Sequence, residues 1–154
     1  MNDLSRDFSH GDGFSIGKFC VIEQGTRLGK DVKLGNYVYL GYNTKIGDGT
    51  KIDHRVSSSG ANKIGKDCTI RYGAILCRNI EIGDDVFISP NVMTIYLDAD
   101  QDEGEKIVIE DGAFIGTGAV INEGVTIGKN AKVGALSMVL RDVKEDEVVM
   151  GVVK

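Results

Sequence analysis

Residues 107–139 read IVIEDGAFIGTGAVINEGVTIGKNAKVGALSMV, and this stretch decides the fold that the sequence predicts. A branched aliphatic residue returns at every sixth position, and a small or β-branched residue follows each one four positions later. This period is neither the 3.6 residues of a helix nor the two-residue alternation of a hairpin strand. The aliphatic residues are Ile109, Ile115, Ile121, Ile127, Val133 and Val139, and the residues that follow them are Ala113, Ala119, Val125, Ala131, Ser137 and Val143.

A repeat of six residues predicts a short strand followed by a corner. The aliphatic residue and the small residue both point inward, because successive side chains of a strand alternate between its two faces. Glycine is frequent between them, and a corner often needs the positive φ that glycine adopts freely. Three sides close a triangular coil, and each strand then pairs in parallel with its equivalent one coil later. An internal repeat of this kind indicates a solenoid.

The same phase begins at Ile16 and continues without a shift to Ile88. Ser58 and Thr94 occupy phase positions on one side of the coil but are polar, so we expect that side to be irregular at both places. The phase shifts before Ile109, after the acidic segment YLDADQDEGEK, which we expect to leave the solenoid as an excursion loop. Insertions in repeat proteins often build the binding face. A solvated acidic loop without a role is the alternative.

The chain is expected to form a single all-β domain, a triangular solenoid of about six coils. Its expected parts are an N-terminal cap that includes His10, regular coils, the excursion, late coils and a short C-terminal cap. These parts cover residues 1–15, 16–94, 95–107, 108–143 and 144–154 of the sequence.

Composition and charge exclude several classes of function. The net charge of −5 gives no argument for binding nucleic acid or an anionic membrane surface. No apolar run approaches the roughly 20 residues of a membrane span, and the N-terminus lacks the apolar stretch of a signal peptide. The odd number of cysteines, three, weakly favours a reducing compartment. We therefore expect a cytoplasmic protein.

The repeat resembles the hexapeptide acyltransferase family over nearly the whole chain from Ile16. The segments 115–121 (IGTGAVI) and 133–139 (VGALSMV) resemble late coils of the short sugar O- and N-acetyltransferases. The ending VMGVVK at 149–154 resembles their closing segment, but it lacks the proline of the usual Gly-x-Pro-Ala-Lys and is one residue shorter. The resemblance implies a left-handed parallel β-helix, and the periodicity alone cannot supply this hand.

The resemblance also implies an acetyl-CoA-dependent acetyltransferase that forms a homotrimer and needs no metal. In the family, pantetheine lies in a groove between two prisms and makes hydrogen bonds to backbone groups of the late coils. The acceptor would be an amine or hydroxyl of a small polar molecule, such as a nucleotide-linked amino sugar. The matching cofactor-binding positions are Gly116, Gly118, Ala119, Gly134, Ala135 and Ser137, with Lys154 near the adenine or a phosphate.

The family commonly places a histidine near the excursion as the general base, and this excursion has none. An imidazole titrates near neutral pH, which suits removal of a proton from an attacking amine or hydroxyl. His54 is the first candidate, although a surface histidine without a role is the simpler interpretation. The carboxylates of Asp98 and Asp100 compete with it. Asn91 is a candidate for orienting the substrate or binding the oxyanion.

Three other classes of function can be compared with this one. A non-catalytic scaffold or regulatory subunit would keep the solenoid and lack the base. A γ-type carbonic anhydrase on the same fold would need three histidines on one metal, and the chain has two. A nucleotidyltransferase would need a further sugar-nucleotide domain, for which 154 residues leave no room.

Overall fold

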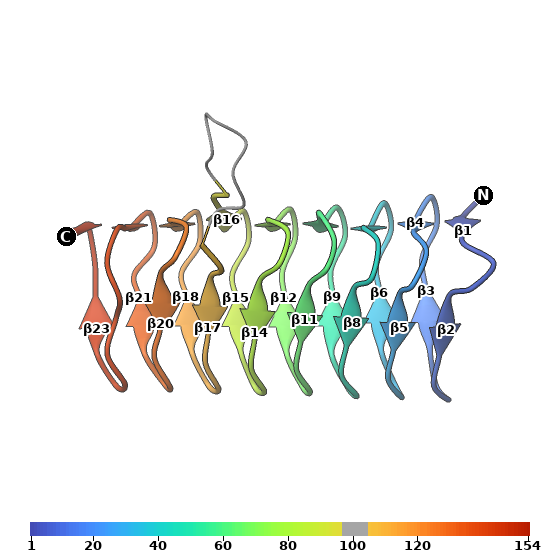
Figure 1. The fold of residues 1–154 in the computed structure, drawn as a ribbon, viewed down its shortest axis with the longest axis horizontal. Helices are drawn as coiled ribbons and strands as arrows, with labels where there is room; N and C mark the ends of the chain where they lie inside the picture. The colour runs from blue at the N-terminus through green and yellow to red at the C-terminus, as the bar shows by residue number, and fades with distance from the viewer. Residues whose placement is uncertain (97–104) are drawn as a thin grey trace.

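The computed structural model describes residues 1–96 and 105–154, and in these residues the chain winds into a straight, three-sided parallel β-solenoid (Figure 1). It contains 24 strands of two residues each, divided over three parallel sheets, which corresponds to about eight turns. No helix occurs in the described part of the chain. The predicted fold class, an all-β triangular solenoid, is confirmed. The expected number of coils was too low, because the solenoid includes both ends of the sequence.

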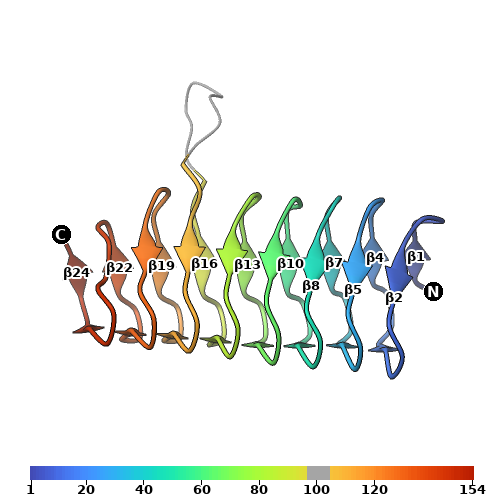
Figure 2. The ribbon, with the colours of Figure 1, turned by 60° about the horizontal axis from the view of Figure 1, so that its bottom comes forward.

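Sheet A has nine strands, which are labelled along the solenoid in Figure 2, and its outer face is largely apolar. The first residue of most of its strands points outward, and Val21, Ile75, Met93 and Met138 are all exposed there. The strands, in spatial order, are β1 (Asp3–Leu4), β4 (Val21–Ile22), β7 (Tyr39–Leu40), β10 (Ser57–Ser58), β13 (Ile75–Leu76), β16 (Met93–Thr94), β19 (Val120–Ile121), β22 (Met138–Val139) and β24 (Val152–Val153).

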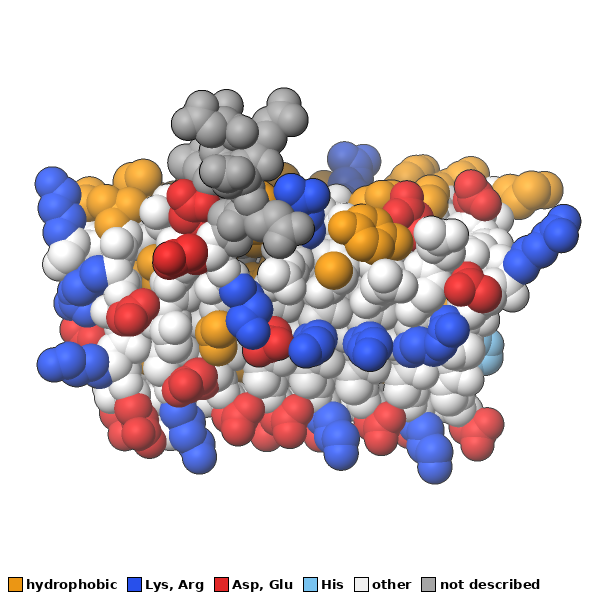
Figure 3. Space-filling model, in the orientation of Figure 1, with side chains coloured by type: hydrophobic (Ala, Val, Ile, Leu, Met, Phe, Trp, Pro, Cys, Tyr) orange, Lys and Arg blue, Asp and Glu red, His pale blue; other side chains and the backbone are white. Residues whose placement is uncertain are grey.

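Sheet B has seven strands and presents cations outward. Arg27 pairs with Lys45, and Lys45 pairs with Lys63, so the three side chains form a row across the face seen in Figure 3. An isolated parallel bridge between Ile127 and Val143 extends this sheet by one further level. The strands are β2 (Ser9–His10), β5 (Arg27–Leu28), β8 (Lys45–Ile46), β11 (Lys63–Ile64), β14 (Glu81–Ile82), β17 (Val108–Ile109) and β20 (Thr126–Ile127).

Sheet C has eight strands and closes the triangle. Its outer face carries two stacked phenylalanines, Phe87 and Phe114, whose ring centroids lie 5.5 Å apart. The strands, from the N-terminal end, are β3 (Ser15–Ile16), β6 (Lys33–Leu34), β9 (Lys51–Ile52), β12 (Thr69–Ile70), β15 (Phe87–Ile88), β18 (Phe114–Ile115), β21 (Lys132–Val133) and β23 (Val148–Val149).

Three edges join the sheets, and the sequence-predicted site residues and the excursion lie on two of them. The C–A edge joins sheet C to sheet A, and the A–B edge joins sheet A to sheet B. The C–A edge consists of residues 17–20, 35–38, 53–56, 71–74, 89–92, 116–119, 134–137 and 150–151. The A–B edge, as far as the structure describes it, consists of residues 5–8, 23–26, 41–44, 59–62, 77–80, 95–96, 105–107, 122–125 and 140–143.

The third edge, between sheets B and C, is held together by hydrogen bonds from one coil to the next. The backbone N–H of Lys30 donates to the Asp48 carboxylate at 2.8 Å, and that of Lys66 donates to Asp84 at 2.7 Å. A corner leaves such N–H groups without a strand partner, and an unpaired backbone group is costly where water cannot reach it. The acidic residues along this edge therefore serve the fold.

The core confirms the predicted phase but corrects the expected irregular side. Ser58 and Thr94 lie in regular strands and point inward, where each is almost fully buried. The Ser58 hydroxyl accepts a hydrogen bond from the Asn62 amide at 2.8 Å, and the Thr94 hydroxyl accepts one from the Cys77 N–H at 2.7 Å. Because these hydroxyls are paired, their burial costs little, and the side stays regular.

The two ends form turns of the solenoid where separate caps were expected. At the N-terminus, β1 pairs with β4 and β2 pairs with β5, while at the C-terminus β23 pairs with β21 and β24 pairs with β22. His10 stacks on Phe14 at 4.5 Å in the first turn, and Phe8 and Phe14 pack against the core. A polar residue is tolerated at this phase position because the side chain of His10 is exposed.

Candidate functional site

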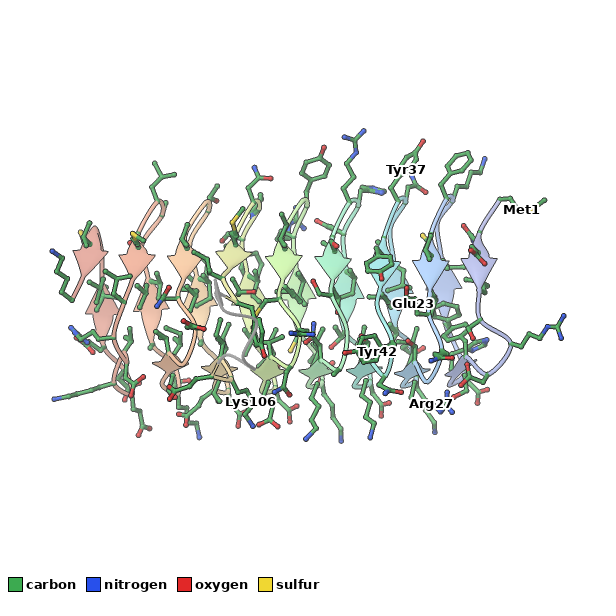
Figure 4. The ribbon with its side chains drawn as sticks, turned by 45° about the horizontal axis from the view of Figure 1, so that its top comes forward. Met1, Glu23, Arg27, Tyr37, Tyr42 and Lys106 are labelled. Carbon is green, nitrogen blue, oxygen red and sulfur yellow. The ribbon has the colours of Figure 1, made fainter. Side chains whose placement is uncertain are left out.

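The predicted site residues divide between the two edges of sheet A. His54, Asn91 and the late-coil glycines lie on the C–A edge, whereas the excursion leaves sheet A after β16 on the A–B edge. Figure 4 shows the separation, with Tyr37 on the C–A edge and Tyr42 on the A–B edge. The root of the excursion was expected near His54, about two coils along one corner. The root of the excursion is also displaced from His54 across sheet A. One side of the coil has six residues, which span at most roughly 20 Å.

Asp98 and Asp100, the competing bases, lie outside the described residues. The structure describes the excursion only at its two ends, around Tyr96 and around Glu105 and Lys106. The role of the two aspartates in catalysis therefore stays a prediction.

His54 is exposed and is held by the coil that precedes it. Its Nδ1 accepts a hydrogen bond from the backbone N–H of Asn36 at 2.7 Å. The Asn36 side chain does the same for the N–H of Lys18, at 2.8 Å. Since Nδ1 is the acceptor, a neutral His54 ring carries its proton on Nε2 and offers a donor to the solvent. Sequence reasoning found His54, but not this bond to the preceding coil.

The surroundings of His54 are polar on one side and aromatic on the other. Arg71 and Asp53 form an ion pair at 3.1 Å beside it, where the C–A edge leaves sheet C. The next residue, Arg55, lies over the ring of Tyr37, with 5.7 Å between its guanidinium carbon and the ring centroid. Tyr37 in turn stacks on Phe19 at 5.1 Å. The C–A edge around His54 is therefore an exposed ridge of large side chains.

Asn91 lies on the same edge, two coils beyond His54, in the left-handed backbone region with a φ of 57°. Its side-chain oxygen lies against Gly73 of the preceding coil, where a Cβ would approach it to 2.5 Å. Asparagine tolerates this backbone conformation better than most residues, so the corner by itself accounts for Asn91. A role in orienting substrate stays a prediction.

The predicted cofactor-binding residues differ in their exposure. Ala119 and Ser137 point into the core and are at most 1% exposed, and Gly116 is also buried. The Ser137 hydroxyl accepts a hydrogen bond from the N–H of Gly151 at 3.1 Å. Ala135 is exposed. Side chains at positions 119 and 137 therefore serve packing, and a ligand on this edge would meet the surface at positions 118 and 135.

The C–A edge has unpaired backbone donors at these late coils. Among residues 1–96 and 105–154, no acceptor lies within hydrogen-bond range of the N–H groups of Thr117 and Ala135. The equivalent N–H groups of Lys18 and Asn36 are both paired with side chains of the next coil, whereas those of His54 and Tyr72 also lack a partner in the described ranges. The sequence explains this difference. In the next coil, Ala135 faces Thr117 and Met150 faces Ala135, and neither side chain has a nitrogen or oxygen that could accept a hydrogen bond. Sequence reasoning missed Thr117.

Apolar side chains surround these open donors. Leu136 is 80% exposed and Met150 is 75% exposed on the same edge. Phe114 and Met138 lie beside them on the outer faces of sheets C and A. Lys154 is exposed at the end of sheet A, and its carbonyl oxygen accepts a hydrogen bond from Nε of Arg141 at 3.0 Å. An exposed apolar surface with free amide donors suits a ligand that is part hydrocarbon and part amide.

The cysteines carry no chemistry in this arrangement. Burial raises the pKa of the Cys68 thiol to about 11 and raises that of Cys77 as well. The Cys20 and Cys68 thiols donate to the carbonyls of Gly35 and Gly83, at 3.1 and 3.0 Å. In the part of the chain that the structure describes, no three His, Cys, Asp or Glu side chains gather in a way that could hold a metal ion. The described residues likewise include no helix that could cross a membrane.

Comparisons with known proteins identify the repeat. A model described as bacterial transferase hexapeptide (six repeats) matches residues 106–141, and one described as hexapeptide repeat of succinyl-transferase matches residues 11–42. The chain belongs to the hexapeptide-repeat transferase family. The bifunctional protein GlmU of Brevibacillus brevis is 32% identical over 132 residues, which are 86% of this chain and 24% of that protein. The chain thus spans about a quarter of the length of the curated relatives that it matches.

Solved structures share the fold of this hexapeptide-repeat protein. PerB from Caulobacter crescentus, solved with CoA and GDP-perosamine, has a TM-score of 0.66 at 23% identity and covers 74% of this chain and 51% of its own. A variant of AntD, an N-acyltransferase from Bacillus cereus solved with dTDP and coenzyme A, has a TM-score of 0.61 at 23% identity. It covers 90% of this chain and 79% of its own. At these identities the likeness shows the fold alone.

Proposed function

We propose that this chain transfers an acetyl group from acetyl-CoA to an amine or hydroxyl of a small polar acceptor. The observation that carries the proposal is the pair of open N–H groups at Thr117 and Ala135 on the exposed C–A edge. Pantetheine contains two amide carbonyls joined by short hydrocarbon segments, so it can pair with these donors and cover the apolar residues beside them. The presence of coenzyme A in the structures of PerB and AntD supports the cofactor.

The proposed acceptor is a nucleotide-linked amino sugar. PerB was solved with GDP-perosamine, and AntD was solved with dTDP. Both are proteins of the same fold, and nucleotide sugars present the amines and hydroxyls that a thioester can acylate. The choice between N- and O-acetylation follows from the acceptor.

A homotrimer is part of the proposal. Late coils of one solenoid form only one wall for the cofactor, and a second wall must come from another copy. The outer face of sheet A supports this, because exposed apolar side chains on neighbouring strands indicate an interaction surface. These side chains include Val21, Ile75, Met93, Met138 and Val152.

His54 is the first proposed catalytic residue, with Asp98 and Asp100 as the alternatives. Pro90 lies two coils beyond His54 and Gly118 lies one coil further, so roughly 14 Å along the solenoid axis separates His54 from Gly118. Because Nδ1 is bonded to Asn36, base action requires the release of that bond, whereas Nε2–H is already available as a donor. The hydrogen bond from Asn36 to His54 also favours a second candidate function, a non-catalytic scaffold. In that case His54 would only connect two neighbouring coils.

One experiment separates the two functions. Coenzyme A binding is measured by calorimetry, and acetyl transfer to a panel of nucleotide-linked amino sugars is followed by mass spectrometry. A transferase binds coenzyme A and acetylates at least one member of the panel. Binding without any transfer would favour the scaffold, and the absence of coenzyme A binding would refute the proposed function.

A further inference from the structure

The A–B edge contains a hollow that the proposed chemistry on the C–A edge does not use. Its volume is about 140 Å³, and it lies beside the root of the excursion. Its lining residues come from four successive coils, so the hollow runs along the solenoid axis. The residues that line it are Tyr42, Ala61, Arg78, Asn79 and Tyr96.

Gly60 keeps the hollow open. It lies one coil beyond Tyr42 on the same edge and has a φ of 121°, which side-chain-bearing residues rarely adopt. A Cβ at this position would lie 2.9 Å from Cδ1 of Tyr42, so any larger residue would displace the ring. The space between Tyr42 and Arg78 therefore depends on the missing side chain of Gly60.

Arg78 supplies an exposed cation to this hollow. Its guanidinium carbon lies 4.8 Å from the ring centroid of Tyr96. The side chain of Tyr96, and after it that of Tyr42, raises the pKa of the exposed guanidinium. Within the described ranges, no carboxylate lies within 4 Å of Arg78, whereas Arg71 and Arg141 each have a carboxylate partner. The guanidinium is thus held by aromatic contacts, and none of the carboxylates in residues 1–96 and 105–154 pairs with it.

Tyr42 is also fixed in place. Its backbone N–H donates to one oxygen of the Glu23 carboxylate at 3.0 Å, and the other oxygen accepts the Tyr39 hydroxyl at 2.8 Å. Figure 4 shows Glu23 and Tyr42 close together between sheets A and B. The Tyr42 side chain is 38% exposed. One part of its surface packs over Gly60, and the exposed part is available for stacking.

We propose that this hollow binds the nucleoside diphosphate portion of the acceptor, with the diphosphate on Arg78 and the base against Tyr42. This rests on the proposed function for the class of acceptor. A guanidinium matches phosphate oxygens with two parallel hydrogen bonds, and an aromatic ring stacks on any base. Asn79 adds an exposed amide that can pair with the base or the ribose. The hollow is smaller than the roughly 300–1,000 Å³ of a whole ligand site, so it can hold only the contacts to the base and a phosphate, and the rest of the acceptor, including the sugar, must lie outside it.

The test is a calorimetric titration of the full chain with UDP, GDP, uridine, guanosine and pyrophosphate. Arg78→Gln should weaken UDP or GDP binding by at least about 10-fold and leave nucleoside binding unchanged. Tyr42→Ala should weaken both nucleotides and nucleosides and leave pyrophosphate unchanged. The matched control is Lys51→Gln, which removes the same charge from the outer face of sheet C.

The outcomes are separable from those of the proposed function. If the wild-type chain binds no nucleotide, or if Arg78→Gln and Lys51→Gln weaken binding equally, the proposed hollow is wrong. If pyrophosphate binds as tightly as UDP and GDP and Tyr42→Ala changes nothing, the base does not stack there and the proposal fails. Coenzyme A is titrated in parallel, because it tests the C–A edge. Coenzyme A binding without nucleotide binding would overturn the hollow and leave the transferase proposal standing.

Discussion

Replacing His54 with asparagine removes the imidazole and keeps its bond to the neighbouring coil. Asn36 shows that this is possible, because its side-chain oxygen already accepts the N–H of Lys18 at 2.8 Å in the equivalent position. His54 accepts the N–H of Asn36 at nearly the same distance, 2.7 Å. His54→Asn should therefore fold normally and change the free energy of unfolding by less than about 0.5 kcal/mol. His54→Leu, which has no acceptor, should lose about 0.5–1.5 kcal/mol.

The catalytic effect should be far larger than the effect on stability. A positioned acid or base is typically worth about 10²–10⁴-fold in rate, and each tenfold corresponds to about 1.4 kcal/mol of activation free energy. His54→Asn should thus lower turnover by at least about 100-fold, or about 2.7 kcal/mol. Coenzyme A affinity should not change, because Thr117 and Ala135 lie about three or more coils away.

The assay measures initial rates of acetyl transfer, coenzyme A affinity by calorimetry and chemical denaturation for each variant. Asn36→Ala is the matched control, since it removes the same kind of bond one coil earlier and leaves the imidazole in place. Native turnover in His54→Asn would refute the catalytic role. His54 would then be only an acceptor for Asn36, and the aspartates of the excursion would become the candidates.

Three further predictions follow from the core, the cofactor edge and the outer face of sheet A. Asn62→Ala should destabilise the chain by about 2–4 kcal/mol in urea denaturation. The reason is that the Asn62 side chain is fully buried, donates to Ser58 and accepts the N–H of Ile80. A loss of stability below roughly 0.5 kcal/mol in the same assay would contradict this prediction. Ala135→Glu should abolish coenzyme A binding with an unchanged circular dichroism spectrum, whereas Lys51→Gln should bind normally. Light scattering should give three times the chain mass of 16.6 kDa, and a stable monomer at micromolar concentration would rule out the trimer.

The sequence predicted the regular part of the fold because each inward position is encoded locally. Ile109 and Ala113 point inward for the same reason as Ile22 and Thr26, and the pattern repeats over most of the chain. The terminal turns were harder to find, since polar residues such as His10 are tolerated at the exposed end. Ser58 misled the prediction because its partner, Asn62, lies in the following corner, where the pattern gave no reason to look for one.

The candidate site was only partly predictable. Alternation places Ala119 and Ser137 in the core, so their side chains could have been excluded as cofactor contacts from the sequence alone. The bond between His54 and Asn36 depends on two residues one coil apart and on the rotamer of the ring, which a linear pattern does not contain. The hollow at Arg78 depends on a glycine one coil away, and neither residue stands out within its own repeat.

Because each coil closes after a fixed number of residues, the length of the chain before a strand decides which sheet that strand joins. A deletion of 18 residues, such as 37–54, would remove one whole turn and return every later strand to its own sheet, as the pairing of Val21 with Tyr39 shows. A deletion of six residues would rotate all later strands by one side and carry Thr117 and Ala135 away from the column that contains His54. The connection between Thr94 and Val108 does not follow this rule. It is longer than the other corners, yet it still joins a strand of sheet A to the next strand of sheet B. This connection can therefore change in length while the spacing along the C–A edge stays constant.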